Sequence, residues 1–236
     1  MLEPSKFSIF VTGTDTGVGK TLVSAALLHA LARHYPRVVG MKPVAAGTAL
    51  VDGVQANDDV LALRAASSCR VPPELDNPVL LADPLSPHIA AARAGVEISI
   101  AHIVACHRQL LALADAVLVE GAGGFMVPLS DTHTGADLAQ ALGLPVVLVV
   151  GLRLGCLNHA LLTAWAIRAR GLTLAGWVAN HIDPEMLAQA DNIAFLQDQL
   201  QAPLLASIPH QAQPDARQLN LEIPLAWQAT PPRATL

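Results

Sequence analysis

The sequence lacks charge, and in particular it lacks clustered positive charge. Only 14% of its 236 residues are charged, the formal net charge is −5, and no stretch gathers Lys and Arg together. Proteins that bind nucleic acids or anionic membranes do so mainly through clustered basic residues. The composition therefore argues against both kinds of partner, and we expect the substrate to be a small molecule.

Long hydrophobic runs are missing as well. Each apolar segment is too short to span a bilayer, and no basic stretch followed by a long apolar run lies near the amino terminus. We therefore expect a cytoplasmic protein without a membrane partner. Hydrophobic residues nevertheless make up 53% of the chain, so we expect them to fill a large sheet and to allow a contact with a second copy of the chain.

Cysteine and histidine show no metal-ligand spacing. The three cysteines (Cys69, Cys106 and Cys156) are odd in number and widely separated, which is typical of free thiols in a core. The nine histidines are scattered along the chain and do not form a zinc set. The sequence therefore gives no sign of a zinc site or a disulfide framework.

Lysine is scarce in comparison with arginine. Only Lys6, Lys20 and Lys42 are lysine among the 14 basic residues. A lysine supplies a compact charge and a tunable proton, which the planar guanidinium of arginine does not. The retention of lysine at these few positions indicates a chemical task for Lys42 as well as for Lys20.

What the sequence does contain is a phosphate-binding motif. Residues 13–21 read Gly-Thr-Asp-Thr-Gly-Val-Gly-Lys-Thr, between a β-branched apolar run at 7–12 and a run with helical spacing at 22–33. The N–H groups of such a loop bind a polyphosphate at the helix N-terminus. Lys20 would contact the outer phosphates, and the Thr21 hydroxyl would bind Mg²⁺. The alternative, a glycine-rich turn that merely precedes a helix, does not explain why strand, loop and helix agree.

Three further charged residues are predicted to share an edge of the sheet with this loop. Lys42 ends the predicted strand 37–42, and Glu120 follows the predicted strand 116–119. Asp59 lies in the first turn of a predicted helix. Ligands bind at the carboxyl edge of an open α/β sheet, where the two carboxylates could hold Mg²⁺. Simpler alternatives remain open, namely a solvated lysine, a helix-dipole partner at Asp59 and a salt bridge at Glu120.

Predicted strands and helices alternate along the chain, without a repeat or a linker. This order predicts one three-layer α/β domain with a mostly parallel sheet over residues 1–210. We expect loops without regular structure at 43–53 and 70–85. The tail at 211–236 is rich in Gln, Ala and Pro, and we expect it to be partly loose.

Seven short motifs follow one another between residues 7 and 209. They are the loop at 13–21, Lys-Pro-Val at 42–44, Asn-Asp-Asp at 57–59, Ser-Pro-His at 86–88, Val-Glu-Gly-Ala-Gly-Gly at 119–124, Gly-Cys-Leu-Asn-His at 155–159 and Gly-Trp-Val-Ala-Asn at 176–180. With this ordered set the chain resembles the dethiobiotin synthetase family. The resemblance implies a single-domain, three-layer P-loop NTPase-like fold and a homodimer with the substrate site at the interface.

The resemblance also implies a reaction. Members of the family use ATP, with Mg²⁺ as cofactor, to close the ureido ring of dethiobiotin from 7,8-diaminopelargonate and CO₂. The reaction runs through a carbamate and a carbamic-phosphoric anhydride and belongs to biotin biosynthesis. The implied partners are therefore these small molecules and a second copy of the chain.

Roles for individual residues follow from the same resemblance. Lys42, which would hold the carbamate, and Lys20 would be catalytic. The implied metal ligands are Thr21, Asp59 and Glu120. ATP would contact Gly17, Val18, Gly19, Lys20, Thr21, Leu22, Asp59, Glu120, Gly121, Ala122, Gly123, Asn180, His181, Ile208, Pro209 and His210. The substrate would contact Thr16, Lys42, Ala46, Gly47, Ser86, Gly155, Cys156 and Asn158.

Three positions depart from the pattern of the family. Ala46 stands where the family often has Ser or Thr, so the N–H of Ala46 or Gly47, or Thr48, would have to replace a hydroxyl contact. Gly17 replaces an acidic residue of some members, and His210 stands where some relatives carry tryptophan. These differences concern the substrate and nucleotide contacts.

Two other classes share this broad fold. Dimeric switch ATPases that partition DNA or position division proteins usually carry an extra lysine at the second loop position, which is Thr14 here. Amide-forming synthetases of the cobyrinate type need an ammonia-generating domain, for which 236 residues leave no room. The switch ATPase is therefore the alternative to a synthetase.

Overall fold

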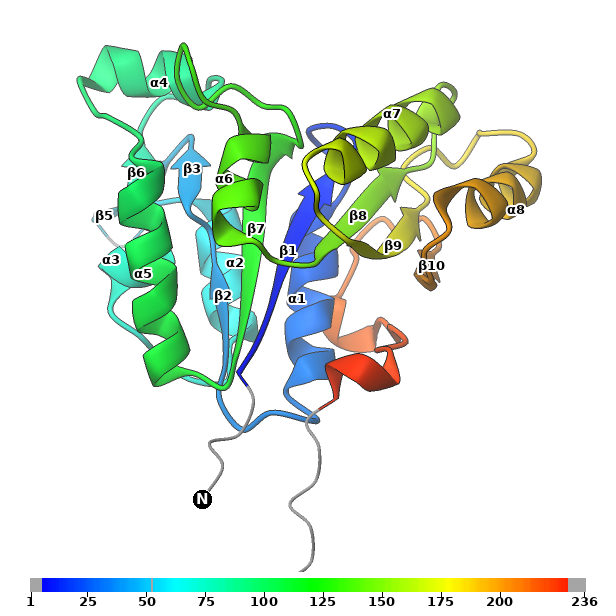
Figure 1. The fold of residues 1–236 in the computed structure, drawn as a ribbon, viewed down its shortest axis with the longest axis horizontal. Helices are drawn as coiled ribbons and strands as arrows, with labels where there is room; N and C mark the ends of the chain where they lie inside the picture. The colour runs from blue at the N-terminus through cyan, green and yellow to red at the C-terminus, as the bar shows by residue number, and fades with distance from the viewer. Residues whose placement is uncertain (1–5, 52, 229–236) are drawn as a thin grey trace, which may run out of the picture.

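A computed structural model describes residues 6–51 and 53–228 (Figure 1). Its centre is a six-stranded parallel sheet with the strand order β10-β9-β8-β1-β7-β2. The strands are β1 (Phe7–Gly13), β2 (Val38–Met41), β7 (Ala116–Gly124), β8 (Val146–Gly151), β9 (Leu174–Asn180) and β10 (Leu204–Ile208). The expected α/β fold with a mostly parallel sheet is confirmed.

Helices cover both faces of this sheet and give the domain three layers. One face packs against α1 (Lys20–Leu31) and α2 (Asp58–Ala66), and the other against α5 (Ile100–Leu113), α6 (Gly135–Leu142), α7 (Cys156–Ala169) and α8 (Gln189–Leu200). Neighbouring strand residues alternate between the two cores, as Ile9 and Phe10 do in β1. Because both faces are buried, each strand is an apolar run, which explains why the sequence revealed the strands.

The two segments expected to lack regular structure carry short elements instead. The first contains β3 (Val44–Ala46) and β4 (Ala49–Val51), and β5 (Val54–Ala56) follows it. The second contains α3 (Pro73–Asp76) and β6 (Val79–Leu81), and α4 (Pro87–Ala94) follows it. The prediction was wrong because β3 pairs with β6, some 35 residues away, and three-residue strands show no periodicity. This small sheet extends the carboxyl edge beyond β2.

The described part of the tail packs at the opposite, amino end of the sheet. It contains two 3₁₀ turns, Ala216–Gln218 and Leu225–Trp227. Trp227 is buried, its ring lies 5.8 Å from that of Phe7, and the Tyr35 hydroxyl donates to its carbonyl over 2.9 Å. Among the residues described, no helix is both long and apolar enough to cross a membrane.

Candidate active site

The phosphate loop joins β1 to α1 in a conformation that requires glycine. Gly17 and Gly19 have φ angles of 74° and 89°, in the left-handed region where side chains are disfavoured. A Cβ atom at Gly13 would lie 2.6 Å from Val18, and one at Gly19 would lie 2.2 Å from the Asn180 amide nitrogen. Since α1 begins at Lys20, its free N–H groups face the loop, as in an anion site.

Four elements bring four polar side chains together beside this loop. The Lys42 ammonium donates to Glu120 Oε1 over 2.6 Å and to Asp59 Oδ2 over 2.8 Å. The Thr21 hydroxyl lies 2.7 Å from Asp59 Oδ1 and 2.9 Å from Glu120 Oε1. Lys42 follows β2, Glu120 lies in β7, and Thr21 and Asp59 lie in the first turns of α1 and α2. The predicted convergence of Lys42 with the two carboxylates is therefore present.

Backbone contacts fix both Lys42 and Asp59. The Lys42 N–H donates to the Asp76 carbonyl over 2.8 Å, and the buried Asn77 side chain donates to the Lys42 carbonyl over 2.7 Å. Asn57 caps α2, because its side-chain oxygen accepts the N–H groups of Asp59 and of the next residue. The role of Asn77 was missed from the sequence, since only tertiary packing brings it to Lys42.

Burial and charge shift the proton affinities of this cluster. Burial lowers the pKa of Lys42, but the charges and hydrogen bonds of Glu120 and Asp59 outweigh that effect and raise it. Burial would raise the pKa of Asp59, but the charge and the hydrogen bond of Lys42 outweigh this effect, and the pKa is lowered. Burial and the nearby Lys42 charge lower the pKa of Lys20 to about 8. Lys42 is thus a firmly charged ammonium beside the ionised Asp59.

The same residues fit a magnesium ion. Glu120 is fully buried, and its Oε2 atom has no hydrogen-bond partner among the described residues. Carboxylate and hydroxyl oxygens next to a phosphate loop are ligands that Mg²⁺ prefers. No set of three or more His, Cys, Asp or Glu side chains within residues 6–51 and 53–228 could hold a metal by itself. The Thr21 hydroxyl and nucleotide phosphates would have to complete the coordination.

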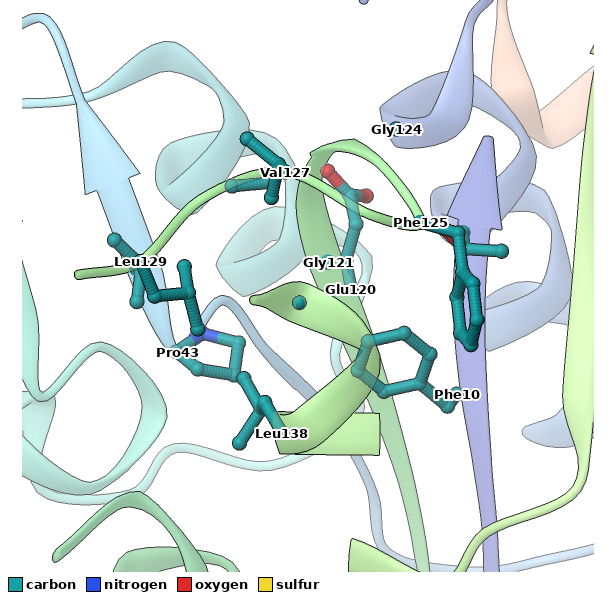
Figure 2. A pocket seen from close by; sticks show the side chains of 13 residues that line it. Phe10, Pro43, Glu120, Gly121, Gly124, Phe125, Val127, Leu129 and Leu138 are labelled. Carbon is teal, nitrogen blue, oxygen red and sulfur yellow. The ribbon is translucent and has the colours of Figure 1, made fainter. Parts of the chain in front are cut away.

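A small apolar cavity lies on the inner side of Glu120. Its volume is about 10 Å³, and its lining includes Phe10, Pro43, Leu129 and Leu138 (Figure 2). These side chains offer no polar partner for a carboxylate. A buried charge needs such a partner, so the charge of Glu120 has to be balanced by the cations on its other side.

A pocket of about 570 Å³ opens next to Lys42. It collects several residues that the sequence had pointed to, among them Thr16, Lys42, Asp59, Ala46, Ser86, Ala122 and Gly123. Gly47 does not line it, and its N–H is already bonded to the Leu81 carbonyl. The Thr48 hydroxyl is bonded to Gln55. Of the groups considered as substitutes for a hydroxyl at position 46, the Ala46 backbone is therefore the one at the pocket.

The residues expected at the nucleotide base lie at the ends of β9 and β10. Asn180 is buried and donates to the Val18 carbonyl over 2.9 Å, so it contacts the phosphate loop itself. Both ring nitrogens of His181 have protein partners, Gln189 at 2.7 Å and Ser207 at 2.9 Å. His210 lies 3.3 Å from the His181 carbonyl. The structure thus places these residues next to one another, with Asn180 in contact with the loop.

The start of α7 lies apart from the pocket beside Lys42. Gly155 caps the helix with φ 95°, Cys156 is buried and Asn158 is exposed, and none of them lines that pocket. One residue of this segment escaped the sequence analysis: Arg153 forms an ion pair with Asp15 of the phosphate loop. Its position just after β8, at the same edge as the loop, was the available signal.

Known structures share this fold. The septum site-determining protein MinD of Pyrococcus horikoshii OT3, complexed with Mg-ADP, matches with a TM-score of 0.55 and 18% identity over 87% of this chain and 82% of that one. A ParA family ATPase of Chlorobium tepidum TLS matches with a TM-score of 0.54 and 14% identity over 88% and 85%. At such identities the likeness concerns the fold alone.

A third structure shows that the likeness can be partial. The signal recognition particle receptor FtsY of Elizabethkingia anophelis, in complex with GDP, matches with a TM-score of 0.52 and 18% identity. The match covers 92% of this chain and 60% of FtsY.

A family model described as an AAA domain matches residues 8–218. The chain therefore belongs to the AAA domain family, and it is an ATP-binding P-loop NTPase.

Proposed function

We propose that the protein is a dethiobiotin synthetase, which uses ATP to join CO₂ to 7,8-diaminopelargonate and to close the ureido ring. The observation that carries this proposal is the position of Lys42. Its ammonium is buried between Asp59 and Glu120, beside the phosphate loop, and it also lines the pocket of about 570 Å³. An enzyme that only hydrolyses ATP does not need a pocket for another substrate beside the phosphate loop.

The proposed reaction has three steps. One amine of the substrate combines with CO₂ and loses a proton, which gives a carbamate. A carbamate oxygen attacks the γ-phosphorus of ATP, ADP leaves, and a carbamic-phosphoric anhydride forms. The second amine then attacks the carbonyl carbon of this anhydride and loses a proton, phosphate leaves, and the ring closes.

Concentrated positive charge is what these steps require of the protein. The carbamate and the triphosphate are both anions, and relief of their repulsion is the main device of phosphoryl transfer. Lys20 at the loop and Lys42 at the pocket supply two ammonium groups on either side of the reacting atoms. Magnesium, held by Thr21, Asp59 and Glu120, would neutralise phosphate charge when bound.

The remaining residues are assigned to the ligands by location. Thr16, Ala46 and Ser86 would contact the diamine, because they line the pocket with Lys42. Asn180, His181 and residues 208–210 would contact the adenine, because Asn180 contacts the phosphate loop and the others lie beside Asn180 and His181. Since the proposed reaction consumes ATP, we expect it to run in the cytoplasm.

We further propose a homodimer with the substrate site at its interface. Large apolar side chains are exposed just before α7 and along it: Leu154 is 94% exposed, Leu162 58% and Trp165 70%. Such a patch needs a partner surface in water. A second copy that covered it would bring Gly155, Cys156 and Asn158 to an interface, where they could contact the far carboxylate of the substrate.

The proposal is tested with ATP, Mg²⁺, labelled bicarbonate and 7,8-diaminopelargonate. We expect the label to enter dethiobiotin and ATP consumption to depend on the diamine. A Lys6→Met variant serves as control, because Lys6 contacts Ala114 and Asp115, away from the loop. The likeness in fold to MinD and ParA favours a switch ATPase as second candidate, and ATP turnover that ignores the diamine would support it.

A further inference from the structure

The three N–H groups of the Lys42 ammonium are all engaged. They face Glu120 Oε1 at 2.6 Å, Asp59 Oδ2 at 2.8 Å and the Gly121 carbonyl at 3.4 Å. An ammonium has three donors and no acceptor. Although Lys42 lines the large pocket, it therefore has no donor left for a ligand there until one of these contacts breaks.

The two carboxylates that hold Lys42 are the ones that would bind a magnesium ion, and Glu120 Oε1 is the oxygen that faces both Lys42 and Thr21. Glu120 Oε1 accepts from Lys42 and lies 2.9 Å from the Thr21 hydroxyl, which also lies 2.7 Å from Asp59 Oδ1. A dication bound to Thr21 and to both carboxylates would lie close to the ammonium, and like charges in a buried site repel strongly. The metal and the ammonium would therefore compete for Glu120 Oε1 and repel one another across the site.

We propose that Lys42 occupies the cation site of the nucleotide-free protein and that magnesium nucleotide displaces it into the pocket. The inference rests on the proposed function in so far as Thr21, Asp59 and Glu120 hold magnesium there. It adds a coupling between metal binding and the availability of the Lys42 ammonium. Lys42 becomes available to an anion in the pocket only after the metal has taken over Asp59 and Glu120. The substrate carbamate would accordingly be bound after the nucleotide.

Lys42 also balances the charge of the carboxylates at this site. Glu120 is fully buried and Lys42 is 4% exposed. The buried Glu120 and the partly exposed Asp59, whose side chain is 42% exposed, would repel one another without a cation between them. Lys42 supplies this cation from the chain itself, so the metal site remains formed before the metal arrives.

Ammonium NMR on the wild-type protein tests the proposal directly. The chain has only three lysines, so ¹⁵N-lysine labelling gives few signals, and the buried, hydrogen-bonded Lys42 ammonium should exchange slowest with water. We expect its signal to shift or vanish on addition of Mg²⁺ with a non-hydrolysable ATP analogue. The same analogue with EDTA should leave the signal in place. A Lys42 signal unchanged by the magnesium complex would overturn the proposal.

Magnesium titration of a Lys42→Met variant gives a second readout, with Lys6→Met as control. Without the competing ammonium, we expect Mg²⁺ added to protein saturated with the non-hydrolysable ATP analogue to bind about tenfold more tightly than in the wild type, and to raise the melting temperature of this variant the most. Equal Mg²⁺ affinity in all three proteins would contradict displacement. Neither experiment contains the diamine. Both therefore test the displacement of Lys42 even if the ring-closure assay shows that the protein does not make dethiobiotin.

Discussion

The Lys42 ammonium and Glu120 Oε1 lie 2.6 Å apart in a place where both residues are almost completely removed from water. Each charge is therefore tolerated only because of the other and of Asp59, which faces Lys42 from α2. Ion pairs of this kind add little net stability as pairs, but removal of one member leaves an uncompensated buried charge. The consequence can be measured.

Glu120→Leu is expected to destabilise the fold by about 3 kcal/mol, at the lower end of the range for broken buried pairs because Asp59 remains. Urea unfolding at neutral pH measures the change. Arg37→Ala is the matched control, since it breaks an ion pair with Asp115 whose arginine side chain is 50% exposed. A Glu120→Leu variant no less stable than this control would show that Lys42 does not depend on Glu120.

Lys42→Met is expected to impair ring closure far more than nucleotide binding. The substitution removes the ammonium at the pocket but leaves Lys20 and the loop N–H groups in place. We expect an affinity for magnesium ATP no weaker than that of the wild type and a loss of dethiobiotin formation of about 10² or more. Fluorescent-nucleotide titration and product assay measure the two quantities. An equal loss of both would remove Lys42 from the chemistry.

Gly19→Ala is expected to damage the phosphate loop more than Gly17→Ala. Both glycines have positive φ, so both substitutions carry a backbone strain of about 1 kcal/mol. Only at Gly19 would the new Cβ meet another group, the Asn180 amide nitrogen at 2.2 Å, whereas nothing lies within 4 Å at Gly17. Nucleotide affinity and urea unfolding compare the variants. Similar losses at both positions would mean that Asn180 moves aside freely.

The sequence predicted the phosphate loop and the approach of Asp59 and Glu120 to it because each has a local sequence signal. Residues 13–21 are contiguous, and Asp59 and Glu120 follow a helix cap and an apolar strand. The sheet order, by contrast, had no local signal, since β1 pairs with β7 and β8, more than a hundred residues away. The proposed contacts of Asn180 with adenine and of residues 155–158 with substrate stay predictions.

Two contacts of the site could not be predicted, for a related reason. Asn77 lies in a segment whose short strand pairs with β3, and only that pairing brings its amide to the Lys42 carbonyl. Arg153 reaches Asp15 because β8 lies next to β1 in the sheet. Both contacts depend on strand neighbours, which one sequence does not reveal.

Arg153→Ala is expected to weaken nucleotide binding about three- to tenfold, because it leaves the Asp15 carboxylate unpaired beside the phosphates. Both side chains are nearly half-exposed, so the effect should be modest and should shrink with added salt. Asp15→Asn in the same chain should restore most of the affinity. A double-mutant cycle built from nucleotide titrations of the single variants and the double variant tests this. If the two changes in binding free energy simply add, Arg153 and Asp15 are not coupled.

His107 is expected to make the fold sensitive to acid, away from the site. It is buried, its Nε2 lies 2.8 Å from Ser8 Oγ, and burial, with a smaller effect of Arg108, lowers its pKa to about 4. The unfolded chain takes up a proton near pH 6.5, while the folded chain does not until about pH 4. Stability associated with neutral His107 is therefore present above pH 6.5 and is lost as the pH falls towards 4.

Comparison of the wild type with a His107→Leu variant isolates this effect. Between pH 7.5 and pH 5 the wild type should lose about 2 kcal/mol more unfolding free energy than the variant, since leucine has no proton to bind. Urea unfolding at both pH values measures the difference, and the other titrating groups cancel because both proteins share them. If the two proteins lose stability in parallel, His107 is protonated in the fold as readily as in the unfolded chain, and its burial does not exclude the charge.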